Sequence, residues 1–195
     1  MQLLLTRHGE TDWNTQSRIQ GNTDTVLNEN GIRQAQELAR RLAGLSPRPL
    51  RVYSSRHKRA LQTADIAAGL LELPCIVQPG IEEISFGLWE GLTWKQVQER
   101  FPGEYPAWHE DRRYRRPPEG ESYQDLLDRV LPALARIVEA EGGPEAEGQV
   151  VVVTHSAVIM SVLCFLDDAP FHEMVKRYRT ENAGIYPVEG RKLHI

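Results

Sequence analysis

Two short apolar segments near the ends of the chain are each followed directly by a histidine. Leu3-Leu4-Leu5-Thr6 leads into Arg7-His8, and the valine run at 150–153 leads into Thr154-His155. Uninterrupted apolar runs of this length are typical of strands buried on both faces, as in a parallel sheet. Either histidine alone is explained well enough as a residue at a strand end. If both strands are parallel in one sheet, however, the histidines leave it at the same edge, and we expect them to share a site.

The rest of the chain alternates between strand and helix signals. The expected elements are a strand at 2–6, a helix from an Asn28 cap to 45, a strand at 50–53, a helix capped by Ser54 or Ser55 and ending near 71, a strand at 75–78, a helix at 121–141, a strand at 149–153, a helix at 157–166 and an edge strand pair from Ala183. This order predicts an α/β fold, a three-layer α/β/α sandwich with a mainly parallel central sheet. Ligands of such sheets bind beyond the carboxyl ends of the strands.

The middle segment, at about 82–122, differs in composition from the rest. It is rich in aromatic residues and arginine, and prolines at 102, 106, 117 and 118 divide it into short pieces. We therefore expect a single domain over residues 1–195 in which this segment forms a lid-like insertion. Ring and cationic surfaces that could contact a phosphorylated sugar or nucleoside are offered by Trp108, Arg112, Arg113, Tyr114, Arg115 and Arg116. A solvated basic loop is the alternative interpretation.

Composition excludes some classes of function. The formal net charge of -4 and the isoelectric point near 5.9 argue against bulk affinity for nucleic acid. No apolar run approaches the roughly 18 residues of a membrane helix, and we interpret the N-terminus as a strand rather than a signal peptide. Cys75 and Cys164 have no metal-ligand or CxxC spacing and are interpreted as structural thiols. These features predict a cytoplasmic protein.

Two further groups of residues could carry chemistry. Arg56 and Arg59 lie three positions apart at an expected helix start, where free N–H groups favour anions, although a solvated basic helix start is the common alternative. The pair Glu82-Glu83 adjoins an apolar and aromatic segment, which can raise the pKa of a carboxyl and suit it to proton donation, although most such pairs are simply exposed. The remaining histidines, interpreted as surface residues without metal spacing, are His57, His109, His172 and His194.

Ordered motifs extend over nearly the whole chain. They are Arg7-His8-Gly9-Glu10-Thr11 with Trp13-Asn14, Arg18-Ile19-Gln20-Gly21, Lys58-Arg59-Ala60-Leu61-Gln62-Thr63-Ala64, Glu83-Ile84-Ser85-Phe86-Gly87-Leu88-Trp89-Glu90-Gly91, Glu119-Gly120-Glu121-Ser122 and Val152-Val153-Thr154-His155. Together they resemble the histidine phosphatase superfamily, also called phosphoglycerate mutase-like. The resemblance implies that fold, with His8 as the nucleophile, Glu83 as general acid and base, and a phosphate pocket of Arg7, Asn14, Arg59 and His155. It implies no metal and no other cofactor, because the arginines and a second, protonated histidine would stabilise the transferring oxygens. Ser156 departs from the pattern, which usually has glycine there; its hydroxyl could donate to phosphate instead.

The superfamily contains both phosphatases and mutases, so the fold alone does not select the reaction. The compact length resembles the phosphatase branch. We therefore expect a metal-independent phosphoric monoester hydrolase that acts on a small phosphorylated metabolite through a phosphohistidine intermediate. α-Ribazole 5′-phosphate, from cobalamin synthesis, is the leading named candidate. The alternatives are a cofactor-dependent phosphoglycerate mutase and a non-catalytic phosphate-binding module. No nucleic-acid or membrane partner is expected, and the oligomeric state is left open, a homodimer being one alternative.

Overall fold

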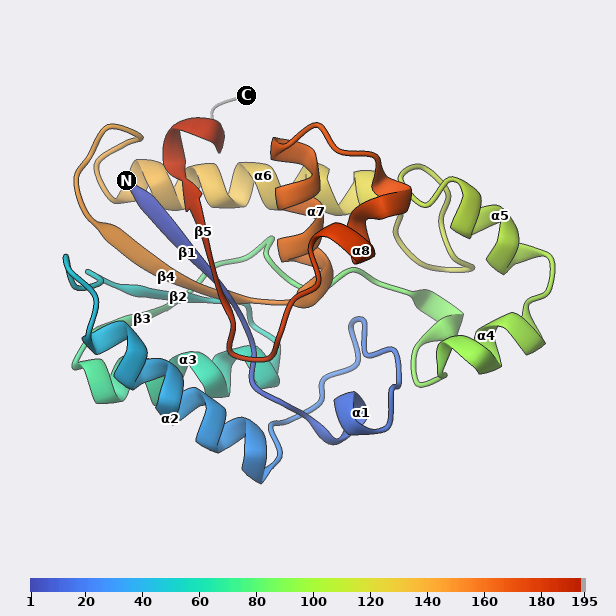
Figure 1. The fold of residues 1–195 in the computed structure, drawn as a ribbon, viewed down its shortest axis with the longest axis horizontal. Helices are drawn as coiled ribbons and strands as arrows, with labels where there is room; N and C mark the ends of the chain where they lie inside the picture. Colours follow the sequence, from blue (N-terminus) through green and yellow to red (C-terminus); the bar gives the residue numbers. More distant parts are fainter. Residues whose placement is uncertain (194–195) are drawn as a thin grey trace.

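In the computed structural model, which describes residues 1–193, a five-stranded sheet lies between two layers of helices (Figure 1). The strands are β1 (Gln2–Arg7), β2 (Val52–Ser54), β3 (Cys75–Val77), β4 (Gln149–Thr154) and β5 (Ile185–Glu189). Their order is β3-β2-β4-β1-β5, in which the first four run parallel and β5 runs antiparallel to β1 at the edge. The mainly parallel sheet expected from the sequence is confirmed.

Alternate residues of the central strands face opposite helical layers. Leu4, Val151 and Val153 pack with the layer of α2 (Glu29–Ala43) and α3 (Lys58–Leu71). Leu3, Leu5 and Val152 pack with the layer of α6 (Tyr123–Ala140) and α7 (Ser156–Leu166). Successive side chains of a strand point to opposite faces, so a sheet covered on both sides needs the continuous apolar runs seen in β1 and β4. The expected three-layer sandwich is confirmed, and Figure 1 shows the helix pairs on opposite faces.

The start of α2 agrees with the expectation from the sequence, and the start of α3 differs from it. Asn28 does cap α2, because its side-chain oxygen accepts a hydrogen bond from the Gly31 amide at 2.8 Å. The cap expected at Ser54 or Ser55 for α3 is wrong, since Ser54 ends β2 and His57 occupies the N-cap without a side-chain bond. Ser55 is thereby left in the turn between strand and helix, where its hydroxyl serves the site described below.

The C-terminal edge is simpler than expected. Within residues 1–193, a single strand, β5, and a short 3-10 helix, η3 (Gly190–Leu193), replace the expected strand pair. His194 lies outside the described residues. β5 pairs with β1 over five positions and forms that edge of the sheet.

The middle segment forms short helices at one end of the molecule, to the right in Figure 1. These are η1 (Gly87–Trp89), α4 (Trp94–Arg100) and α5 (Glu104–Glu110). They pack through aromatic rings, among them Trp89 edge-on to Trp108 at 5.3 Å between centroids, and Trp94 stacked on Trp108 at 5.4 Å. The other short elements are α1 (Asp12–Thr15), η2 (Phe171–Glu173) and α8 (Met174–Arg177).

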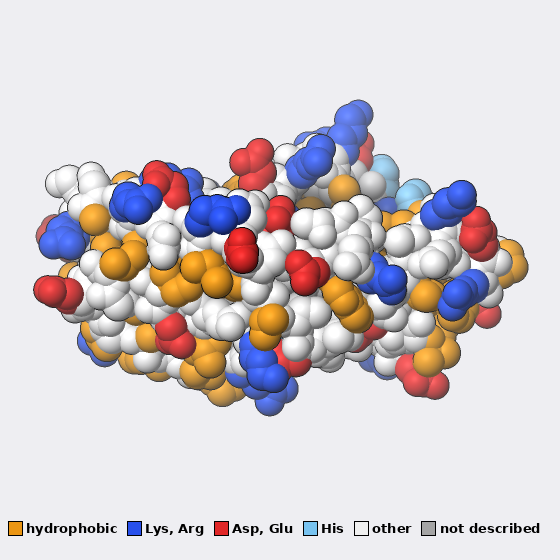
Figure 2. All heavy atoms as spheres, turned by 90° about the horizontal axis from the view of Figure 1, so that it is seen from below, with side chains coloured by type: hydrophobic (Ala, Val, Ile, Leu, Met, Phe, Trp, Pro, Cys, Tyr) orange, Lys and Arg blue, Asp and Glu red, His pale blue; other side chains and the backbone are white. Residues whose placement is uncertain are grey.

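The surface of the molecule has no uniform charge on the side seen in Figure 2, where basic and acidic side chains are interspersed. Over residues 1–193, no helix is both long enough and apolar enough to cross a membrane.

Candidate active site

The two histidines that follow β1 and β4 lie side by side. The strands are adjacent and parallel, and their register pairs Arg7 with Thr154, so His8 and His155 leave the sheet at the same level. Their ring centroids are 5.3 Å apart, and both side chains are buried. The expectation that the two histidines meet at one sheet edge is confirmed.

His8 is held in one tautomer by its own turn. Its Nδ1 lies 2.7 Å from the carbonyl oxygen of Gly9, which can only accept a hydrogen bond. Nδ1 therefore carries the proton, and Nε2 keeps its lone pair. Burial, followed by the positive charges of Arg59 and Arg7, lowers the pKa of His8 well below its usual value. The imidazole is thus neutral at pH 7, the form that attacks phosphorus.

The backbone of the same turn is fixed from three sides. The His8 amide donates to the Thr154 carbonyl at 3.0 Å, and the Asn182 side-chain amide donates to the His8 carbonyl at 3.0 Å. The Gly9 amide donates to the Thr63 hydroxyl at 2.9 Å. A Cβ at Gly9 would lie 2.5 Å from the Gly31 carbonyl oxygen, so the start of α2 approaches this turn only because position 9 is glycine.

His155 is oriented by Ser55. Its Nε2 lies 2.9 Å from the Ser55 hydroxyl, whereas no hydrogen-bond partner meets its Nδ1 within residues 1–193. The Ser55 hydroxyl also accepts the His57 amide at 3.4 Å. In the tautomer in which that hydroxyl donates to Nε2, Nδ1 carries the ring proton and can donate to a ligand. Burial, then Arg59, lowers the pKa of His155 well below its usual value. This shift favours neutral His155 over the protonated form that the resemblance implies.

Two arginines supply positive charge. Arg59 is fully buried, and its terminal nitrogens donate to the carbonyl oxygens of Thr23 and Gly21 at 2.8 and 2.7 Å. Arg7 donates to the Thr180 carbonyl at 2.9 Å. Neither forms an ion pair within residues 1–193, and the Nε of each is buried without a partner. Burial lowers the pKa of both, but an arginine remains protonated. Their charges are available to an anion.

Glu83 adds a buried carboxylate to the site. One oxygen accepts the Ile84 amide at 3.0 Å, and the other accepts the Ala157 amide of the first turn of α7 at 3.3 Å. Burial raises the pKa of Glu83, opposed by Arg59, the two amides and Arg7. A carboxyl whose pKa is raised in this way can hold a proton for a leaving group.

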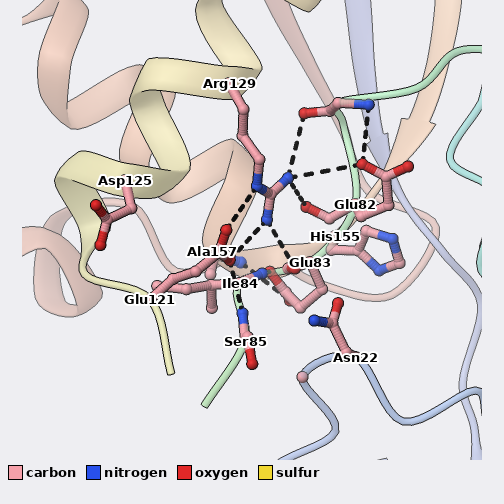
Figure 3. Close-up of polar contacts among 12 residues, drawn as sticks. Asn22, Glu82, Glu83, Ile84, Ser85, Glu121, Asp125, Arg129, His155 and Ala157 are labelled. Carbon is pink, nitrogen blue, oxygen red and sulfur yellow. Dashed lines mark hydrogen bonds and ion pairs between the residues drawn. The ribbon is translucent and has the colours of Figure 1, made fainter. Parts of the chain in front are cut away.

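The segment that carries Glu83 is fastened to α6 by Arg129 (Figure 3). The Arg129 guanidinium donates to the backbone carbonyls of Gly80, Glu82 and Glu83 at 3.2, 2.8 and 2.9 Å. Its charge is balanced by Glu121, because the Nε and one terminal nitrogen of Arg129 each donate to a different Glu121 carboxylate oxygen at 2.9 Å. The second Glu121 oxygen also accepts the Ser85 amide at 2.9 Å. The backbone on both sides of Glu83 is therefore anchored.

Asn14 is positioned by the capping box of α1. Its side-chain oxygen accepts from the Thr11 amide at 3.0 Å and from Asn182 at 3.4 Å. With the oxygen occupied, the side-chain N–H groups of Asn14 are those left to face the pocket.

A pocket of about 480 Å³ joins these groups. Five of the sequence-predicted residues line it: Arg7, His8, Asn14, Arg59 and Glu83. His155 lies against the ring of His8. An aromatic and apolar wall includes Phe86, Trp94 and Tyr123, and Arg18 and Arg179 add positive charge. Ser156 also lines the pocket, but its hydroxyl is 2.7 Å from the Thr180 hydroxyl, so it joins α7 to the segment that holds Arg7.

The six residues expected on a lid are placed elsewhere. None of Trp108, Arg112, Arg113, Tyr114, Arg115 and Arg116 lines the pocket that contains His8. Arg116 forms an ion pair with Asp125 at 2.6 Å, and Arg113 donates to Gln124 at 3.1 Å, so both brace the start of α6. Trp108 and Arg112 line an adjoining hollow. Arg56, kept as a possible contact, pairs with Glu82 at 3.1 Å.

Sequence reasoning missed two residues of this site. Ser55 was expected to cap a helix and was given no role in the site, although its position directly after β2 places it at the same sheet edge as the histidines. His57 was interpreted as a surface residue, and that is wrong: its ring is buried 5.0 Å from the ring of His155. Its place next to the start of a helix that follows a strand end gave the only signal. His109 and His172 are exposed, as expected.

Comparison with known proteins bears directly on this arrangement. A family model described as "Histidine phosphatase superfamily (branch 1)" matches residues 3–193. The chain is 39% identical to a metal-independent phosphoserine phosphatase of Arabidopsis thaliana over 83% of its own length. Among solved structures, a mycobacterial glucosyl-3-phosphoglycerate phosphatase superposes with a TM-score of 0.83 at 34% identity, covering 95% of this chain and 90% of that one. An α-ribazole phosphatase of Shigella flexneri gives 0.81 at 29% identity, covering 96% and 89%.

Some relatives are longer than this chain. It spans 66% of the length of the plant protein and 29% of a rat 6-phosphofructo-2-kinase/fructose-2,6-bisphosphatase, to which it is 33% identical over 88% of its own length. The family match nevertheless extends over nearly all of the present residues and includes every motif that surrounds the pocket. The chain belongs to the histidine phosphatase superfamily, branch 1.

Proposed function

We propose that this protein hydrolyses phosphomonoesters of small metabolites by transferring the phosphoryl group to Nε2 of His8 and then to water. One observation carries the proposal: the Nδ1 contact to Gly9 leaves Nε2 as the unprotonated nitrogen of a neutral imidazole in the pocket shared with Arg7 and Arg59. A nucleophile next to donors of positive charge is the arrangement that phosphoryl transfer requires.

In the first step, Nε2 bonds to phosphorus while the bond from phosphorus to the ester oxygen breaks. Protonated Glu83 donates to that oxygen, so the alcohol leaves neutral. In the second step, Glu83, now a carboxylate, accepts a proton from water whose oxygen attacks the phosphohistidine. Phosphate is released and His8 is regenerated. Arg7, Arg59, Asn14 and the Nδ1–H of His155 stabilise charge on the non-bridging oxygens throughout.

We further propose that the reaction needs no metal ion. No group of three or more His, Cys, Asp or Glu side chains in residues 1–193 is placed to bind one. The cationic groups around His8 can take over the electrostatic role that a metal ion plays in other phosphatases. The name of the plant relative, a metal-independent phosphoserine phosphatase, points in the same direction.

The organic part of the substrate would lie against Phe86, Trp94 and Tyr123. Such a wall suits a ring-bearing monophosphate, and α-ribazole 5′-phosphate is the first candidate from the sequence. Phosphoserine and glucosyl-3-phosphoglycerate are added by the names of the relatives. Transfer between positions of phosphoglycerate, as in a mutase, is the alternative reaction.

The decisive experiment measures phosphate release from p-nitrophenyl phosphate and from these metabolites in EDTA, with wild type and His8→Ala. Turnover by the wild type and its loss in the folded variant are expected. Brief incubation with labelled substrate should also leave acid-labile, base-stable phosphate on the wild type alone. Appreciable activity in His8→Ala would refute the nucleophile, and conversion of 3-phosphoglycerate to 2-phosphoglycerate faster than phosphate release would favour the mutase. Binding without turnover would identify a phosphate-binding module.

A further inference from the structure

A second hollow, of about 380 Å³, adjoins the pocket that contains His8. Trp94, Tyr123 and Val175 line both spaces, so the hollow continues the pocket along this wall. Beyond the shared wall lie Trp108, on α5, and Arg112, from the segment between α5 and α6. A molecule with its phosphoryl group at His8 that extends along Trp94 and Tyr123 would reach this second space.

Arg112 in this hollow is a buried cation without an anion. Its side chain is 6% exposed, and its guanidinium carbon lies 5.0 Å above the Trp108 ring. No hydrogen bond or ion pair reaches the guanidinium within residues 1–193, and its Nε is buried without a partner. Arg112 also borders a third hollow whose wall includes Glu110, Asp111 and Asp168, but none of these carboxylates forms an ion pair with it.

On the side of the second hollow, no described carboxylate compensates the charge of Arg112. The other titratable groups on the hollow are His109, His172 and Lys176, which are basic, together with tyrosines; no aspartate or glutamate lines it. A charged side chain removed from water is costly unless it is paired, and such a residue in a cavity marks a place for an opposite charge. The cation–π contact with Trp108 offsets only part of that cost.

We propose that this hollow is a second substrate subsite, in which Arg112 binds an anionic group at the far end of the phosphorylated metabolite. The inference rests on the proposed function and narrows its substrate class. The substrate is a phosphomonoester that carries a carboxylate or a second phosphate, separated from the ester phosphate by a chain or ring. The aromatic faces of Trp94 and Tyr123 between the two spaces suit a planar or apolar linker.

The test uses a homologous series of ω-phosphooxy carboxylic acids of increasing chain length, each matched with the alkyl phosphate that lacks the carboxylate. The wild type is expected to prefer the carboxylate at one chain length by about tenfold to a hundredfold in kcat/KM, as is typical for a contact to a charged group. Arg112→Met, which keeps the packing on Trp108, should lose that preference while retaining turnover of the alkyl phosphates. Arg112→Lys should retain part of it. A parallel series of α,ω-bisphosphates determines which anion fits better.

Arg113→Met is the matched control, because Arg113 is the next residue in the same segment but does not line the hollow. It should keep the preference for the carboxylate. The absence of any preference in the wild type, or an equal loss on both series in Arg112→Met, would overturn the subsite. If no compound releases phosphate, the proposed function fails by itself. Binding of the same compounds, followed by tryptophan fluorescence, then decides the subsite: weaker binding of the carboxylates alone in Arg112→Met supports it, and unchanged binding refutes it.

Discussion

Arg129, on α6, donates a hydrogen bond of 2.9 Å to the backbone carbonyl of Glu83, which lines the same pocket as His8. The guanidinium touches the main chain of Glu83 and never its carboxylate. Arg129 is therefore a positioning residue. Its hydrogen bonds to three backbone carbonyls hold the segment that bears the proposed acid in place against α6.

We expect Arg129→Met to lower kcat by about tenfold to a hundredfold on alkyl phosphates, because a small displacement of a catalytic group has an effect of that order. The loss on p-nitrophenyl phosphate should be smaller, since nitrophenolate leaves without full protonation. Arg129→Lys should recover part of the activity. Arg136→Ala, on the exposed side of the same helix, is the control and should change neither rate. A uniform loss on both substrates would indicate a general loss of folded protein instead.

Much of this arrangement could be predicted from the sequence. The apolar runs of β1 and β4 are long enough to identify buried parallel strands, and the motifs that follow them carry His8 and His155. Arg129 could not be found in this way, because its partners are backbone carbonyls 46 to 49 residues away, which leave no pattern in side-chain identity. The unpaired charge of Arg112 is hidden for the same reason: a sequence displays the arginine and its acidic neighbours but not whether any of them forms an ion pair with it.

Glu83→Gln should remove the basic limb of the pH profile. The raised pKa of Glu83 keeps the carboxyl protonated to a higher pH than an ordinary glutamate, and the acid is lost as the pH rises through that pKa. For an alkyl phosphate, kcat in the wild type should therefore fall above this pKa, and the variant should be slower at all pH values without that fall. The wild type and the variant are measured on the same substrate, so that ionisation of the substrate phosphate affects both pH profiles equally. An unaltered basic limb in the variant would assign it to another group.

Ser55→Ala tests the orientation of His155. Without the hydroxyl, Nε2 of His155 loses its partner and the Nδ1–H tautomer is no longer favoured. We expect a decrease in kcat of about tenfold, in line with the loss of one well-placed donor to a developing charge. Ser54→Ala is the matched control, since among residues 1–193 the Ser54 hydroxyl bonds only to the Ser55 carbonyl, at 2.8 Å. Nitrogen-15 NMR of the His155 ring reports the tautomer directly, and an unchanged spectrum in Ser55→Ala would contradict the assignment.

His57→Leu should make the folded state more resistant to acid. Burial, together with the charge of Arg59, lowers the pKa of His57 from 6.5 to about 4. The unfolded chain therefore binds a proton at His57 before the folded chain does, and stability falls as the pH decreases from about 6.5 toward 4. His8 and His155 act in the same direction, so the variant should lessen the slope without abolishing it, by up to about 1.4 kcal/mol per pH unit. Urea unfolding at a series of pH values gives this slope. His109→Leu, at an exposed position, should leave it unchanged, and an equal slope in wild type and His57→Leu would show that His57 titrates alike in the folded and unfolded chains.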